Sequence, residues 1–221
     1  MALTGPSTGT PMAPMKPAPH AEAGRIRIIG GRWRGTRLSV PASPGLRPSS
    51  DRVRETLFNW LMPALQGARV IDAFAGTGAL GLEAVSRGAA QAVLVERDAA
   101  LAQALRATVE RLSAQASVEI VHSDALAWLA RQAPASFDLA FVDPPFGAGL
   151  WQATLEVLLP TLAPGAWVYV ESPHDRAPAL PPQWGLHREG RTREVRFALY
   201  RAPDGRGADT LNGNVSVAVP E

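Results

Sequence analysis

Short apolar segments alternate with helical patterns over residues 69–171, and this alternation leaves few possible folds. The apolar segments are almost continuous, as expected of strands that are covered on both faces. Helical patterns with one apolar face separate them. This order favours a doubly wound α/β fold with a mostly parallel sheet, whose ligands bind beyond the carboxyl ends of the strands. The predicted strands are 69–73, 92–96, 118–122, 137–142 and 166–171, and the predicted helices are 79–87, 99–112, 125–131 and 151–162.

Weaker patterns flank this alternation on both sides. After it, residues 185–189 and 195–201 have a short charged link between them and predict an antiparallel hairpin at the sheet edge. Before it, residues 26–29 and 36–40 predict a small hairpin, and Ser49 or Ser50 can cap a following helix that runs to about Leu61. We expect a disordered proline-rich tail at 1–24, a hairpin and helix extension at 25–66, the main domain at 67–202 and a flexible tail at 203–221.

The basic residues are concentrated near the start of the chain. The formal net charge of the 221 residues is only +2, yet residues 25–54 contain eight arginines and a single acid, Asp51. Such a patch is typical of a nucleic-acid-binding surface. A solvated arginine-rich surface without a partner is the alternative interpretation. The predicted nucleic-acid contacts are Arg27, Arg32, Trp33, Arg34, Arg47, Arg52 and Arg54.

Several classes of protein are disfavoured by what the sequence lacks. It has no cysteine, which rules out disulfides and thiolate zinc sites and suits a reducing cytoplasm. Its four histidines are scattered, so we predict no metal site. It has no apolar run long enough for a membrane span, and we expect a soluble, cytoplasmic protein with no membrane partner.

A glycine-rich turn follows the first strand of the main domain. Gly76, Gly78 and Gly81 have the G-x-G-x-x-G spacing of a nucleotide-cofactor site, and Glu96 lies 20 residues after Gly76, where it can accept from ribose hydroxyls. The spacing alone fits a nicotinamide cofactor or S-adenosylmethionine. Asp72 favours the second, because a carboxylate repels a pyrophosphate but not a sulfonium. Asp72 could instead cap the turn through its own backbone.

Asp124 is a further candidate at the end of the third strand. It could accept a hydrogen bond from an adenine amino group, or it could equally be the N-cap of the next helix. The predicted cofactor-binding residues are Asp72, Ala73, Phe74, Gly76, Gly78, Glu96, Asp124 and Ala125.

The tetrapeptide Asp143-Pro144-Pro145-Phe146 follows the apolar strand 137–142. Two successive prolines stiffen the turn and remove two N–H donors, so the Asp143 side chain and the Pro144 carbonyl can both act as acceptors for an exocyclic amine. Phe146 can stack on an extruded base. The alternative is a rigid loop whose Asp143 caps a turn and whose Phe146 fills the core. Glu171, at the end of the last parallel strand, can reach this site or can be a surface acid without a function.

Several segments together resemble the RsmD family of class I methyltransferases. The resemblance covers residues 25–201 and rests on the run 27–35, the run 47–61 and the segment 72–89. More broadly, the glycine-rich turn, Glu96, Asp124 and the Asp143 tetrapeptide, in this order, resemble class I methyltransferases that modify exocyclic nitrogens of nucleic acid. The resemblance implies a seven-stranded class I methyltransferase sheet. It also implies a catalytic loop formed by Asp143, Pro144, Pro145 and Phe146.

The resemblance implies S-adenosyl-L-methionine as cofactor and the exocyclic N2 of one guanine in 16S ribosomal RNA as target. The partner would be that RNA within an assembling small ribosomal subunit, and a monomer would suffice because one domain carries all the parts. Three alternatives stay open: a methyltransferase for adenine N6 or cytosine N4, a non-catalytic RNA-binding assembly factor, and a dehydrogenase that uses the glycine-rich turn.

Overall fold

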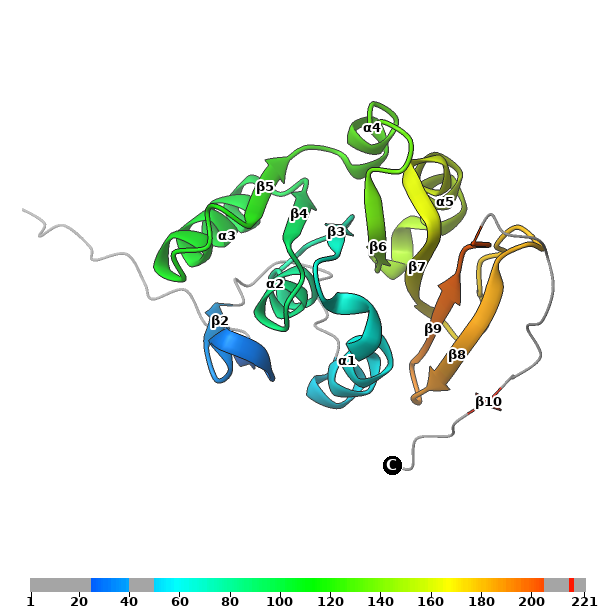
Figure 1. Cartoon of the computed structure of the whole chain (residues 1–221), viewed down its shortest axis with the longest axis horizontal. Coiled ribbons are helices and arrows are strands. Elements are labelled where there is room, and N and C mark those ends of the chain that lie inside the picture. Colours follow the sequence, from blue (N-terminus) through cyan, green and yellow to red (C-terminus); the bar gives the residue numbers. More distant parts are fainter. Residues whose placement is uncertain (1–24, 40–49, 205–214, 217–221) are drawn as a thin grey trace, which may run out of the picture.

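An eight-stranded sheet forms the centre of the protein in the computed structural model, which describes residues 25–39, 50–204 and 215–216 (Figure 1). Its strand order is β10-β8-β9-β7-β6-β3-β4-β5. The strands are β3 (Arg69–Asp72), β4 (Gln91–Glu96), β5 (Val118–His122), β6 (Phe137–Val142), β7 (Leu162–Pro173), β8 (Gly185–Arg191), β9 (Val195–Arg201) and β10 (Val215–Ser216). The helices that connect the parallel strands are α2 (Ala79–Ser86), α3 (Ala99–Arg111), α4 (Ala125–Leu129) and α5 (Trp151–Leu158), with short 3-10 turns η2 (Phe146–Ala148) and η3 (Leu159–Thr161).

The parallel part of the sheet has its topological switch point between β3 and β6. From β3 the chain adds β4 and then β5 on one side, and it then crosses back to place β6 on the other side of β3. Helices that follow β3 and β6 therefore leave the sheet in opposite directions, which opens a crevice at the carboxyl ends of these two strands. The predicted doubly wound α/β fold is confirmed.

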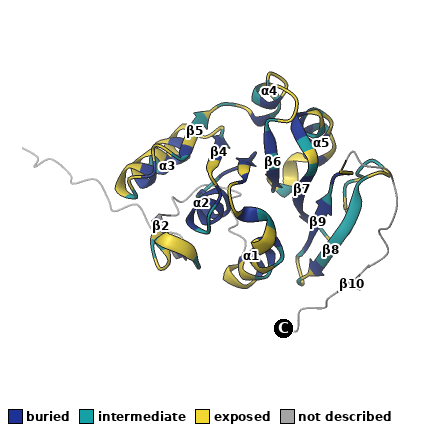
Figure 2. Ribbon diagram, in the orientation of Figure 1, coloured by how far each residue is buried: buried dark blue, intermediate teal, exposed yellow. Residues whose placement is uncertain are grey.

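Two apolar clusters cover the two faces of the sheet. One contains side chains of α2 and α3, such as Leu82 and Leu105, together with the N-terminal extension. The other contains side chains of α4 and α5, such as Leu129 and Leu155. Strands β3 and β6 are buried on both faces (Figure 2), which explains why their sequences are almost continuously apolar.

Strands β8 and β9 form the predicted antiparallel edge, with β9 paired to β7. The structure adds one strand to the seven that were predicted. Residues 215–216 form β10, which pairs in parallel with β8 and falls in the segment that was expected to be a flexible tail. The predicted proline-rich tail at 1–24 lies outside the described residues.

The N-terminal extension contains the hairpin and the helix that were predicted. Strands β1 (Arg25–Arg27) and β2 (Arg37–Ser39) pair antiparallel around a 3-10 turn, η1 (Gly31–Trp33). Helix α1 (Asp51–Leu65) begins after Ser50, whose Oγ accepts from the Val53 N–H at 3.3 Å. The helix continues four residues beyond the predicted end at Leu61 and passes through Pro63, because Leu65 extends its buried face. Pro63 has no N–H to donate to the carbonyl four residues earlier, and the helix nevertheless continues to Leu65.

Candidate active site

The switch point brings two predicted loops to the same edge of the sheet. Asp72 at the end of β3 is in register with Phe141, two residues before Asp143. The glycine-rich loop leaves β3 and the Asp143 loop leaves β6, so both loops begin at the carboxyl ends of neighbouring parallel strands. This is the place where open α/β sheets bind their ligands.

The glycines of the first loop serve distinct structural purposes. Gly76 and Gly78 have φ values of +53° and +76°, a backbone conformation that residues other than glycine rarely adopt. At Gly78 an added Cβ would lie 2.6 Å from the Leu105 side chain. Gly81 has ordinary backbone angles, but its Cβ would lie 2.6 Å from Leu94, so it lets α2 approach β4 closely. The loop therefore presents backbone rather than side chains at the carboxyl edge of the sheet.

Asp72 is buried beneath this loop and holds it in place. Only 2% of its surface is exposed, and its Oδ2 accepts from the Gly81 N–H at 3.0 Å. Burial raises the pKa of Asp72 to about 7, against the hydrogen bonds from Gly81 and Phe74 that lower it, and the charge of Glu96 raises it further. These contacts are the turn-capping arrangement that was the alternative interpretation of Asp72. Its predicted contact with a cofactor stays a prediction.

Glu96 and Asp124 both accept backbone hydrogen bonds at the same edge. Glu96 is half-buried, and its carboxylate accepts from Gly76 N–H at 2.8 Å and from Asp98 N–H at 2.7 Å. Asp124 is exposed, and its Oδ1 accepts from Ala127 N–H at 3.0 Å as the N-cap of α4. Glu96 thus ties the end of β4 to the glycine-rich loop. A carboxylate offers about four acceptor positions, so these bonds leave both residues able to accept from a ligand.

The Asp143 loop is anchored to α5 through an aromatic contact. Pro144 is buried, while Asp143 and Phe146 are half-exposed. The Phe146 ring lies against Trp151, with ring centroids 5.8 Å apart. The Trp151 Nε1–H donates to the backbone carbonyl of Glu171 at 2.7 Å, which fixes the loop relative to the end of β7.

Tyr169 and Glu171 lie near the end of β7, beside the Asp143 loop. The structure corrects the interpretation of Glu171 as a surface acid. Glu171 is only 5% exposed, and Tyr169 is fully buried. The Tyr169 hydroxyl donates to Glu171 Oε2 at 2.8 Å. Burial raises the pKa of Tyr169 well above its usual range, and the negative charges of Glu171 and Asp143 add to this rise. Glu171 thus bonds the phenol directly, and Asp143 follows two residues after Phe141, which is in register with Tyr169 on the neighbouring strand.

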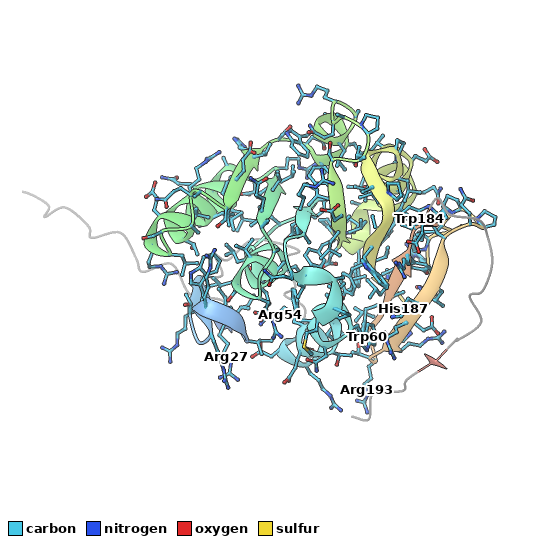
Figure 3. All side chains as sticks on the ribbon, in the orientation of Figure 1. Arg27, Arg54, Trp60, Trp184, His187 and Arg193 are labelled. Atoms are coloured by element: carbon cyan, nitrogen blue, oxygen red, sulfur yellow. The ribbon has the colours of Figure 1, made fainter. Side chains whose placement is uncertain are left out.

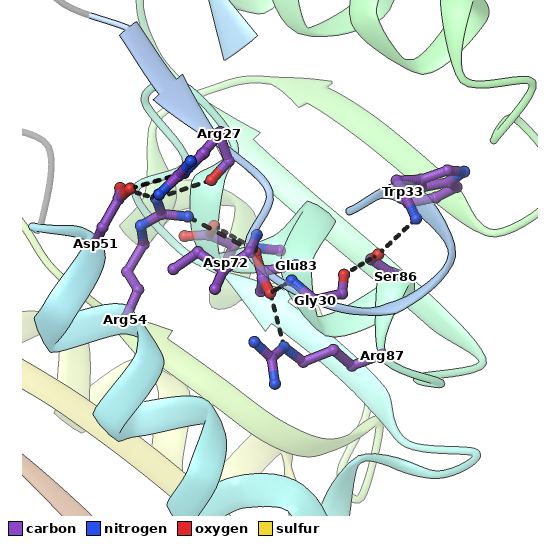
Figure 4. Close-up of polar contacts among 11 residues, drawn as sticks. Arg27, Gly30, Trp33, Asp51, Arg54, Asp72, Glu83, Ser86 and Arg87 are labelled. Atoms are coloured by element: carbon purple, nitrogen blue, oxygen red, sulfur yellow. Dashed lines mark hydrogen bonds and ion pairs between the residues drawn. The ribbon is translucent and has the colours of Figure 1, made fainter. Parts of the chain in front are cut away.

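The structure also overturns one predicted nucleic-acid contact. Arg54 is completely buried, donates to the Arg27 carbonyl at 2.9 Å and pairs with Asp51 and Glu83 (Figure 4). Glu83, also fully buried, accepts from the N–H groups of Ile29 and Gly30, each at 2.7 Å. Arg54 thus stabilises the contact between the N-terminal extension and α2 and cannot reach a phosphate.

Glu83 was not singled out from the sequence, although one signal was present. It is the only acid in α2, and every residue of that helix is buried. An acid at such a position requires partners. Besides the two backbone N–H groups, it binds Arg87 Nε at 2.7 Å. Residues 29, 30, 54 and 87 therefore all converge on one carboxylate.

The remaining predicted nucleic-acid contacts differ in where they lie. Arg32, Arg34 and Arg52 are exposed, and the Arg27 side chain is 68% exposed while it pairs with Asp51. Trp33 is half-buried under the Arg32 guanidinium, 4.2 Å from the ring centroid. Arg47 lies outside the described residues. The hairpin packs on the C-terminal half of α2, where Trp33 N–H donates to Ser86, and so it lies at the end of α2 opposite the glycine-rich loop.

Neither a metal site nor a membrane span is found within the described part of the chain. There, no group of three or more histidine, cysteine, aspartate or glutamate side chains is placed to hold a metal ion. Within the same residues, no helix has the length and apolar character needed to cross a membrane.

Comparison with known proteins gives consistent matches along the chain. The model of a family described as conserved hypothetical protein 95 matches residues 26–201. The ribosomal RNA small subunit methyltransferase D of Escherichia coli strain K12 is 48% identical over 190 residues, which cover 85% of this chain and 95% of that protein. Its counterpart from Haemophilus influenzae is 40% identical over 187 residues, covering 83% and 96%.

A solved structure gives the same result for the fold. It is described as a putative methyltransferase, yhhF, from Escherichia coli, and it superposes with a TM-score of 0.75 at 46% identity over 82% of this chain and 99% of that one. Residues 26–201, which the family model matches, include the glycine-rich loop and the Asp143 loop. This chain therefore belongs to the RsmD family of methyltransferases.

Proposed function

We propose that this methyltransferase modifies the exocyclic N2 of a guanine in 16S ribosomal RNA. The proposal rests on one observation: the glycine-rich loop and the Asp143 loop begin side by side, at the carboxyl ends of the paired strands β3 and β6. The first loop suits the methyl donor and the second suits an aromatic amine. The names of the relatives support ribosomal RNA as the substrate class. Family membership argues against the dehydrogenase alternative.

S-adenosyl-L-methionine is the cofactor, and the residues at the first loop fit it. The backbone of Gly76 and Gly78 allows close approach, and Glu96, fixed by two N–H donors, can accept from ribose hydroxyls. Asp124 would accept from the adenine amino group. Held by these residues, S-adenosyl-L-methionine would supply an electrophilic methyl group, and the electron pair of its broken carbon–sulfur bond would remain on sulfur.

The Asp143 loop prepares the amine. The lone pair of guanine N2 is delocalised into the ring, and it becomes available when acceptors hold the two N–H bonds. The Asp143 carboxylate and the Pro144 carbonyl can do this, while Pro145 keeps the turn stiff. As positive charge develops on N2, the carboxylate stabilises it and can take the proton that the nitrogen releases. Phe146, supported by Trp151, can stack on the base.

The N-terminal extension, residues 25–66, would hold the RNA through Arg27, Arg32, Arg34 and Arg52, which are exposed. Contacts of this kind position an RNA without reading its sequence. Since the hairpin lies at the far end of α2, these arginines would bind RNA at a distance from the target base. An RNA that reaches both these arginines and the Asp143 loop would fit an assembling small ribosomal subunit. The enzyme would act on it as a monomer in the cytoplasm.

The test uses labelled S-adenosyl-L-methionine with small subunits from cells that lack the activity, and mass spectrometry of the modified nucleotide. Methyl on guanine N2 supports the proposal. Methyl on adenine N6 or cytosine N4 would select another amine target, and RNA binding without transfer would indicate a non-catalytic assembly factor.

Asp143→Ala is the matched variant for this test. We expect a loss of turnover of about 10²- to 10³-fold with cofactor affinity nearly intact, because one preorganised acceptor is removed. Glu119→Ala, which changes an exposed acid on β5, serves as the control and should retain activity. Turnover of Asp143→Ala within a few fold of the wild type would contradict the assigned role.

A further inference from the structure

Two carboxylates stand at the ends of the neighbouring parallel strands β6 and β7. Phe141 is in register with Tyr169, and Val142 with Val170. The next residues along the two strands are Asp143 and Glu171. Neighbouring strands lie about 4.8 Å apart, so side chains at these two positions can meet one small ligand together.

Glu171 is fixed more firmly than a strand-end acid requires. The Tyr169 hydroxyl holds its Oε2 at 2.8 Å, and Trp151 holds its backbone carbonyl at 2.7 Å. Since Trp151 also packs against Phe146, the position of Glu171 is coupled to the Asp143 loop. Burying a carboxylate is costly unless donors surround it. These contacts hold the buried Glu171 carboxylate in one position, as expected of a group that contacts a ligand.

Aromatic side chains lie on the β9 side of Glu171, away from the Asp143 loop. Glu171 pairs across the sheet with Phe197 of β9. The Phe197 ring stacks on Trp60 of α1, with centroids 5.5 Å apart and an interplanar angle of 24°. Figure 3 shows Trp60 on α1 facing the β8 and β9 edge. The Glu171 carboxylate thus lies between the Asp143 loop and an apolar aromatic wall, surroundings that strengthen hydrogen bonds to it.

We propose that Glu171 reads the target base by accepting a hydrogen bond from guanine N1–H, beside the N2 amine that Asp143 holds. The inference rests on the proposed function and names the residue that confers its base specificity. Guanine carries a ring N–H donor next to its amine. Adenine and cytosine carry an acceptor nitrogen next to theirs, N1 and N3 respectively, and a fixed carboxylate repels such an acceptor. A carboxylate has about four acceptor positions, so its bond with the Tyr169 hydroxyl is compatible with accepting from the base as well.

The selectivity expected of such a contact is large. Sites built to bond a donor on the substrate reject analogues that lack it by factors up to about 10⁴–10⁵, because the buried acceptor is left unpaired. Asp143 alone does not provide this selection, since all three bases offer it an amine. Glu171 supplies the second contact that distinguishes them.

The experiment compares guanine with 2-aminopurine at the methylated position of reconstituted small subunits. 2-Aminopurine keeps the amine at C2 but has an acceptor at N1. Wild-type kcat/KM should fall by on the order of 10²-fold or more on this analogue. Equal rates on the two bases would overturn the proposal. This comparison needs no variant and does not depend on the folding of one.

The variant Glu171→Gln then separates N1 from other differences between the two bases. The Gln carbonyl can still accept from Tyr169, while its amide can donate to the N1 of 2-aminopurine. We expect kcat/KM on guanine to fall by roughly 10²-fold and kcat/KM on 2-aminopurine to stay level or rise, with cofactor affinity unchanged. Glu119→Gln is the control on an exposed strand position.

A parallel loss of activity on both bases in Glu171→Gln would overturn the inference and leave Glu171 as a support of the loop. Failure of the proposed function has a different signature. In that case wild-type enzyme would place no methyl on guanine N2, whatever the response of position 171.

Discussion

Replacing Asp72 by Asn tests whether burial controls the charge beneath the glycine-rich loop. Asp72 is 2% exposed, and its pKa in the folded protein is about 7, against an ordinary value of 3.8. The folded state therefore binds the proton more tightly than the unfolded state. Its stabilising contribution is complete below pH 3.8 and is lost as the pH rises through 7.

The expected size follows from the two pKa values. A difference of about three units corresponds to about 4 kcal/mol at most, at about 1.36 kcal/mol per unit. Between about pH 5 and pH 8 the wild-type free energy of unfolding should lose roughly 2.5 kcal/mol through this one group. Asn does not titrate, yet it keeps an acceptor for the Gly81 N–H. The Asn variant should therefore gain about that amount relative to wild type over the same interval.

Urea unfolding at about pH 5 and pH 8, without cofactor, measures the difference directly, because the titration of other groups is common to both proteins. Asp138→Asn is a control that should show no such change between these two pH values. The pKa of Asp138 is lowered by its hydrogen bond with Arg69, so its contribution is complete at both and is lost only on acidification below the ordinary value of 3.8. If Asp72→Asn differs from wild type by the same amount at both pH values, Asp72 titrates normally and the burial argument is wrong.

Two further predictions concern the N-terminal extension. Glu83→Gln should lower the free energy of unfolding by about 3 to 5 kcal/mol, since it removes the buried charge that faces Arg54 and that accepts from Arg87 and two backbone N–H groups. Urea unfolding measures this, and Glu110→Gln on the exposed face of α3 should change the free energy of unfolding by less than about 0.5 kcal/mol. Replacing Arg32 and Arg34 together by Ala should weaken RNA binding and reduce the slope of log affinity against log salt by about 0.7 to 0.9 for each phosphate that is no longer neutralised; an unchanged slope would remove these arginines from the RNA surface.

The elements whose signal is local could be predicted from the sequence. The strands around the switch point were recognisable because strands buried on both faces are apolar at every position. The cap at Ser50 and the glycine-rich turn were recognisable for a similar reason, since caps and positive φ values depend on a few neighbouring residues. The end of α1 was misplaced because the buried face of Leu65 outweighs the presence of Pro63.

Features that depend on tertiary contacts could not be found in this way. Arg54 was counted with the surface arginines because charge patterning does not show which arginine faces an acid from a distant helix. Its partner Glu83 lies on α2, and strand β3 separates this helix from α1 along the sequence. The burial of Glu171 has the same origin, since the walls around it come from α1, α5 and β9. Sequence periodicity places this residue at a strand end, where exposure is the usual expectation.

These failures all concern charges, and each marks a place where the fold compensates a buried charge with specific donors. Around Glu83 the donors include two backbone N–H groups and Arg87, and they attach the N-terminal extension to α2. Beneath the glycine-rich loop, Asp72 accepts from the backbone of the loop itself. At Glu171 the hydroxyl of Tyr169, on the same strand, donates. Of these three acids, Glu171 is the one that stands level with Asp143, at the end of the neighbouring strand. This position is why base recognition is assigned to Glu171 and to neither of the other two.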